Sequence, residues 1–102
     1  MEAMKKYTFS VEFDGGTYLS QVDADNEVDA VAAWVEKFQT EAPLAARSKR
    51  LVQAVRRGLF DEKLTRVEGL TGTWCFSTLF AKKIVLGHVI LTAPEHADDR
   101  LR

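Results

Sequence analysis

The residues with the clearest chemical potential are five cations in "RSKRLVQAVRRGLF", residues 47–60, a stretch without any acid. Arginine can grip a phosphate with two hydrogen bonds, so a helix carrying several arginines can lie along a nucleic-acid backbone. Specific readers of nucleic acid usually add base-reaching polar residues and a strongly basic domain, whereas this chain has a net charge of −1. A solvated helix face is therefore the favoured interpretation. The candidate anion contacts are Arg47, Lys49, Arg50, Arg56 and Arg57.

The segment before the basic stretch is acidic. From Glu12 to Glu41 there are eight acids and a single base, Lys37. Three carboxylates, Glu12, Asp14 and Asp23, could gather near the first predicted hairpin. Acid–base catalysis by paired carboxylates requires a desolvated cleft, and the rim of a hairpin is wet. We therefore expect these acids to be solvated and the acidic segment to balance part of the charge of the basic helix.

Nucleophiles and metal ligands are few. Cys75, His88 and His96 are the only cysteine and histidines, and no Cys-x-x-Cys or His-x-x-x-His spacing is present. Cys75 stands between two aromatic residues and reads as a small buried hydrophobe, and His88 as a structural histidine within a strand. The glycine-containing stretches "DGG" and "GLTG" lack the Gly-Lys-Ser/Thr ending of a phosphate loop. No catalytic, metal or cofactor site is predicted.

Composition is that of an ordinary globular protein. The 102 residues are 46% hydrophobic and 28% charged, which suits one domain. A single cysteine fits a reducing compartment, and "MEAMKK" carries no apolar signal-peptide core. The longest apolar run, "IVLGHVIL", is far shorter than the roughly 20 residues of a membrane span. We expect a cytoplasmic protein without membrane attachment.

The first element is predicted to be a β-hairpin. In "YTFSVEF", Tyr7, Phe9, Val11 and Phe13 alternate with polar residues. The following "DGGT" supplies the positive φ angles of a tight turn. With Gly15 and Gly16 as the loop, Phe13 pairs with Tyr18, and the apolar residues of both strands share one face. Leu19 is the exception, on the outer face near Glu12.

Two helices follow. In "DADNEVDAVAAWVEKF", Asp25 or Asn26 can cap a helix, and Trp34 widens its apolar stripe. Pro43 separates this helix from the next or begins the next. Ser48 could start the second helix later, and Gly58 could end it. The expected buried stripes are Val28, Val31, Val35 and Phe38 in the first helix, and Leu44, Leu51, Val52, Val55 and Leu59 in the second.

Two more strands are predicted near the C-terminus. The polar stretch "DEKLTRVEGLTG" reads as a connector, and "TWCFSTLF" and "IVLGHVILT" read as strands joined through "AKK". A three-residue turn sets Phe80 against Ile84 and places Trp74, Phe76, Leu86, His88 and Ile90 on one side. A Lys82-Lys83 turn sets Ala81 against Ile84 instead. The register stays open.

The element order β-β-α-α-β-β predicts a two-layer α+β fold. Two hairpins form an antiparallel sheet of about four strands, with two helices on one face. The domain is expected to cover residues 1–94, and the charged tail 95–102 is expected to fray.

Two short motifs, "GGTYLSQV" and "LTGTWCFSTL", resemble a family of small bacterial proteins that share a Gly-Gly-Thr-Tyr hairpin and a Trp-Cys strand. That resemblance implies no known activity and no functional residues. The hairpin followed by a helix is also similar to antitoxin domains of the HicB type. Those domains carry a "PDLPGC"-like turn where this chain has "DGGTYL".

The sequence thus favours a small non-enzymatic module that binds another protein or associates with itself. An open antiparallel sheet has edges to pair, and a symmetric homodimer is the commonest soluble assembly. The alternative is a nucleic-acid-binding or antitoxin-like regulator that uses the basic helix 47–57.

Overall fold

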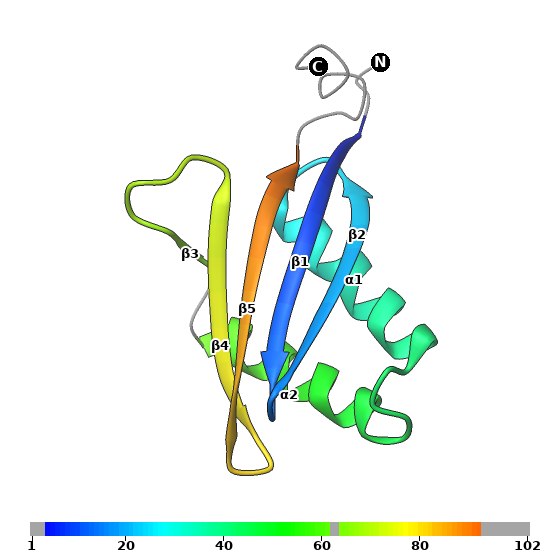
Figure 1. Cartoon of the computed structure of the whole chain (residues 1–102). Coiled ribbons are helices and arrows are strands. Elements are labelled where there is room, and N and C mark those ends of the chain that lie inside the picture. The colour runs from blue at the N-terminus through cyan, green and yellow to red at the C-terminus, as the bar shows by residue number, and fades with distance from the viewer. Residues whose placement is uncertain (1–3, 62–63, 93–102) are drawn as a thin grey trace.

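The computed structural model describes residues 4–61 and 64–92. It contains a five-stranded antiparallel sheet in the order β2-β1-β5-β4-β3, with α1 and α2 packed on one face (Figure 1). The elements are β1 (Lys5–Phe13), β2 (Gly16–Ala24), α1 (Glu27–Glu41), α2 (Arg47–Asp61), β3 (Thr65–Arg66), β4 (Thr73–Phe80) and β5 (Lys83–Thr92). The α+β prediction is confirmed. The sheet has one strand more than expected because β3 lies inside the predicted connector. The predicted tail 95–102 falls outside the described residues.

The first hairpin forms with the predicted faces and a different register. Its turn is Asp14-Gly15, with φ of 50° and 82°, and it pairs Phe13 with Gly16. Tyr18 consequently faces Val11, so the predicted pairing of Phe13 with Tyr18 is wrong. The observed register differs from the predicted one by two residues, and a shift of two residues keeps each side chain on the same face of the sheet. The apolar side chains of β1 are therefore still buried. Leu19 lies on the outer face, as expected, and is 71% exposed.

Helix α1 begins at the predicted cap. The Asn26 side-chain oxygen accepts a hydrogen bond of 2.8 Å from the Asp29 amide. Trp34 is buried and stacks on Phe9, with ring centroids 5.4 Å apart and an interplanar angle of 7°. Val28 was expected in the buried stripe, but it is 65% exposed. Ala30 in the same turn is buried in the core, whereas Val28 lies outside the core and borders a groove.

Helix α2 starts near the predicted serine and continues past the predicted glycine. The buried Ser48 accepts a hydrogen bond of 2.9 Å from the Leu44 amide. Gly58 was expected to end the helix, but it lies inside α2. A Cβ atom at Gly58 would be 2.8 Å from the Thr78 hydroxyl oxygen. This glycine therefore allows α2 to approach β4 closely.

The second hairpin adopts a register that the sequence did not suggest. Its turn is Ala81-Lys82, with φ of 53° and 65°, and it pairs Phe80 with Lys83. Neither the three-residue turn nor the Lys82-Lys83 turn is present. Side chains that the three-residue turn would place together are separated. Trp74 and Phe76 lie on the helical side with Val85, Gly87 and Val89, and Leu86, His88 and Ile90 lie on the outer side.

Aromatic rings join the two layers. The Trp34 ring contacts Phe38 and Phe76, with centroids 5.1 Å and 5.9 Å away. The Phe76 ring lies over Gly87, where any Cβ atom would overlap it. The sheet can therefore receive this ring only because the facing residue of β5 lacks a side chain.

Candidate interaction surface

The outer face of the sheet is divided into a polar half and an apolar half. No described helix covers this face. Strand β1 presents only polar side chains on it, and β2 adds Asp23 and Gln21. Lys6 pairs with Asp23 at 3.2 Å, and Gln21 donates to the Thr8 hydroxyl at 3.0 Å. This half has the polar pattern of a sheet face in contact with water.

Strands β4 and β5 make the apolar half. We call the side chains of Leu79, Ile84, Leu86 and Ile90 the second-hairpin patch. Leu79 and Ile84 are cross-strand partners and are 67% and 65% exposed. A shallow hollow of about 350 Å³ lies beside the patch, lined by Ile84, Leu86 and residues of the first turn. On the same face, Ser77 lies opposite Leu86, and His88 separates Leu86 from Ile90 along β5. Exposed aliphatic side chains that gather on one face are typical of an interaction site.

Cys75 and His88 adjoin the patch. They are cross-strand partners on β4 and β5, and Ser10 faces His88 from β1. All three are partly buried on an open face. Cys75 and His88 therefore meet without the enclosed cleft that nucleophilic catalysis requires. Residues 4–61 and 64–92 contain no group of three or more His, Cys, Asp or Glu side chains that could hold a metal ion. His96 lies outside those residues.

The five predicted anion contacts are all exposed on α2. The Arg47 guanidinium lies over the Phe13 ring, 5.6 Å from its centroid. Arg56 lines the groove between the helices. Lys49, Arg50 and Arg57 are exposed on α2, and none of them forms an ion pair within the described part of the chain. The acidic segment does not neutralise the basic helix through direct ion pairs there.

Of the three carboxylates of the first hairpin, Glu12 and Asp14 line the same hollow, and Asp23 lies apart from them. Asp14 lies in the turn, whereas Asp23 lies near the far end of β2, about nine residues or roughly 30 Å along the strand. Asp14 accepts a hydrogen bond of 2.6 Å from Lys83. This hydrogen bond, with the lysine charge, lowers the pKa of Asp14, and the charge of Arg47 adds to the effect. Asp14 thus ties the two turns together.

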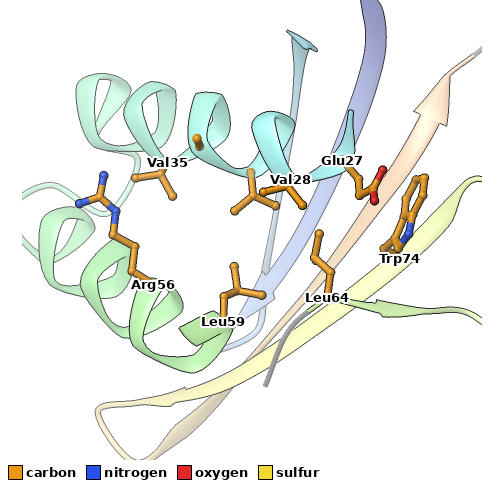
Figure 2. Close-up of a pocket in the computed structure, with 9 residues that line it drawn as sticks. Glu27, Val28, Val35, Arg56, Leu59, Leu64 and Trp74 are labelled. Atoms are coloured by element: carbon orange, nitrogen blue, oxygen red, sulfur yellow. The ribbon is translucent and has the colours of Figure 1, made fainter. Parts of the chain in front are cut away.

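A groove on the helical side was not predicted from the sequence. It lies between α1, α2 and the start of β4, and its volume is about 690 Å³ (Figure 2). Near it, Tyr7 has a raised pKa because it is buried and because Glu27 and Asp25 are close. The exposed Val28 marks this groove, but in the sequence Val28 is indistinguishable from a core valine.

No protein-family model, curated protein or solved structure matches this chain. The resemblance through "GGTYLSQV" and "LTGTWCFSTL" therefore stays a prediction. Among the described helices, none has the length and apolar character needed to cross a membrane.

Proposed function

We propose that this protein is a non-enzymatic, self-associating module in which the second-hairpin patch packs against the same patch of a second copy. The observation that carries the proposal is the composition of β5. Val85 and Val89 are buried on the helical side, yet Ile84, Leu86 and Ile90 face outward. An antiparallel strand with one wet face normally alternates apolar and polar residues, whereas a strand covered on both faces is apolar throughout.

The surroundings of the patch also favour a protein partner. The polar side chains of β1 and β2 form a rim on one side of it, and an apolar centre with a polar rim is the usual anatomy of an interface. The four patch residues are uncharged, and Glu12, the cross-strand partner of Leu86, lies at their border as part of the polar rim. A twofold axis then brings identical aliphatic surfaces together.

The available area favours a weak dimer. Four long strands about 4.8 Å apart and about eight residues long present roughly 500 Å² of flat face, of which the two strands that carry the patch make up about half. A standard interface buries about 800 Å² on each partner, and smaller ones belong to transient complexes. We therefore expect dissociation in the micromolar range.

Pairing through the sheet edges is less favoured than pairing through the face. At one edge, the Lys37 ammonium donates a hydrogen bond of 2.8 Å to the Gln21 main-chain oxygen of β2. At the other edge, β3 is two residues long and pairs only with Trp74 and Cys75, so no described strand pairs with residues 76–80 of β4 on that side. Short strands and lysines are common protections against strand addition. We infer a cytoplasmic location from the single, partly buried Cys75 on the outer face.

Analytical ultracentrifugation of the full chain tests the dimer. Ile84→Lys places a charge at an exposed position within the patch, so it should leave the fold intact and weaken association at least tenfold. Leu19→Lys is the matched control, because Leu19 is exposed on the same face but lies beyond the polar side chains of β1. A wild-type monomer at several hundred micromolar, or equal effects of both substitutions, rejects the proposal.

A second candidate is nucleic-acid binding by α2, which the exposure of Lys49, Arg50 and Arg57 favours. Binding of a fluorescent duplex should fall steeply with salt, and each lost phosphate contact flattens the log–log slope by nearly one unit. Arg50→Gln with Arg57→Gln should therefore flatten it by nearly two. An absence of binding at low salt removes this candidate.

A further inference from the structure

The groove on the helical side has the dimensions of a small-molecule site. Its volume of about 690 Å³ lies within the roughly 300–1,000 Å³ of such sites. Figure 2 shows α1 on one side of the groove and α2 on the other, with Trp74 of β4 at one end. The apolar lining residues are Val28, Val31, Ala32, Val35, Leu59, Leu64 and Trp74.

The two charged residues of the groove lie at opposite ends. Arg56 lies beside Val35, and Glu27 lies beside Trp74 (Figure 2). Neither forms an ion pair with any residue that the structure describes. A guanidinium can bind a carboxylate through two parallel hydrogen bonds. The groove therefore offers a free anion site at the Arg56 end only, because Glu27 repels an anion at the other end.

The apolar wall sets the length of a matching ligand. Val28 and Val35 are two turns apart on α1, which corresponds to roughly 10 Å at 1.5 Å per residue. This wall fits an extended alkyl chain of medium length. Apart from Glu27 and Arg56, the lining residues that the structure describes are all apolar, so none of them requires a hydrogen bond from the middle of the ligand.

We propose that this groove binds a medium-chain aliphatic carboxylate, with its carboxylate at Arg56 and its chain along Val28, Val31 and Trp74. The site lies on the opposite side of the sheet from the second-hairpin patch. Ligand binding therefore does not depend on self-association.

Decanoate is the probe, with decanol and decylammonium as neutral and cationic counterparts of equal chain length. Binding to the full-length chain is measured by calorimetry and by the indole NH signals in NMR. The wild type is titrated first, and then the Ile84→Lys variant, which we expect to be monomeric. Trp74 borders the groove, whereas Trp34 is 1% exposed, so only the Trp74 signal should move. Decanoate should bind more tightly than decanol, and decylammonium most weakly.

Arg56→Gln should weaken decanoate binding about tenfold and leave decanol binding unchanged, because only the charged hydrogen bonds are lost. Arg57→Gln is the matched control. Arg57 is the neighbouring exposed cation on α2 and does not line the groove. Arg57→Gln changes the net charge by the same amount as Arg56→Gln but leaves the groove intact. The affinity of the Arg57→Gln variant for decanoate should therefore equal that of the wild type.

Val28→Asp places a carboxylate at the exposed wall and should abolish binding of decanoate and decanol, while an unchanged Trp34 signal reports an intact core. Three results overturn the proposal: no movement of the Trp74 signal with decanoate, equal affinity of decanoate for the wild type and Arg56→Gln, or preference for decylammonium. The proposal is also overturned if the wild type forms a dimer and the Val28→Asp variant does not, because the groove would then be part of the contact between copies.

Discussion

The two hairpins of the sheet close in the same way and differ in how well their sequences suit that closure. Both turn through two residues with positive φ, Asp14-Gly15 in the first and Ala81-Lys82 in the second. In the first turn, glycine adopts this conformation without a Cβ clash. In the second, both residues carry a Cβ atom, which costs about 1–2 kcal/mol for each. The second turn is therefore held by contacts outside itself.

The two hairpins also differ in the polarity of their outer faces. The first hairpin is apolar toward the helices and polar toward water, apart from Leu19. The second has Phe76 and Val85 inside, and it also places aliphatic side chains outside, where Leu79 and Ile84 accompany Thr73, Ser77 and His88. The comparison teaches that the first hairpin is specified by its own sequence. The second depends on the helices on one side and, in our proposal, on a second copy on the other.

The largest expected effect is at the contact that holds the second hairpin. Gly87→Ala places a methyl group inside the Phe76 ring and should lower the free energy of unfolding by roughly 3 kcal/mol. Urea denaturation at one fixed protein concentration measures it, because self-association raises apparent stability. In the double variant that carries Gly87→Ala and Phe76→Leu, the loss of unfolding free energy should be smaller than the sum of the losses in the two single variants.

The matched change in the first hairpin is Gly15→Ala. No atom outside the neighbouring residues lies within 4 Å of a Cβ atom at Gly15, so only its φ of +82° opposes the substitution. The expected loss is about 1 kcal/mol. A loss at Gly15 as large as that at Gly87 would contradict the view that the two hairpins are held differently.

An intermediate effect of opposite sign is expected in the second turn. Replacing Ala81-Lys82 with Asn-Gly gives this turn the residues that its positive φ angles prefer. The free energy of unfolding should rise by about 1–2 kcal/mol in the same denaturation assay. An unchanged or lower stability would mean that the turn is not strained.

The smallest effect concerns the ion pair between the two turns. Lys83→Gln should raise the pKa of Asp14 toward its ordinary value of about 3.9, as measured by carboxyl ¹³C NMR. The pKa of Asp14 is lower in the folded than in the unfolded chain. The pair therefore stabilises the fold above about pH 4, and this contribution is lost as the pH falls through the folded-state pKa. Lys82→Gln is the control, because Lys82 is not paired with Asp14.

The first hairpin, the two helices and the α+β class could be predicted because each has a local signal. The alternation from Tyr7 to Phe13 fixes the buried face whichever two-residue turn follows. The cap at Asn26 and the break near Pro43 mark the helices in the same local way. The exact turn was missed because Asp14-Gly15 and Gly15-Gly16 both suit positive φ.

The remaining features depend on contacts between distant residues. Strand β3 is too short to show any periodicity, and Ala81-Lys82 is not a preferred turn sequence. Gly58 reads as a helix end unless its approach to Thr78 is known. The groove exists because α1 and α2 leave Val28 uncovered, and helical spacing alone assigns that valine to the core. Of the predicted anion contacts, the sequence could not separate Arg47, over Phe13, from the fully solvated cations.

The hydrogen bond from the Lys37 ammonium to the Gln21 carbonyl protects the β2 edge of the sheet against the addition of another strand. A strand of another molecule could pair with β2 at this position only by displacing the Lys37 ammonium from the Gln21 main-chain oxygen. Packing of two second-hairpin patches against each other, as we propose, displaces no such hydrogen bond. Once two copies are packed in this way, neither patch is available to a third copy. In our proposal assembly therefore stops at a closed pair, and acetylation of Lys37, which removes its charge, should weaken the protection of the β2 edge.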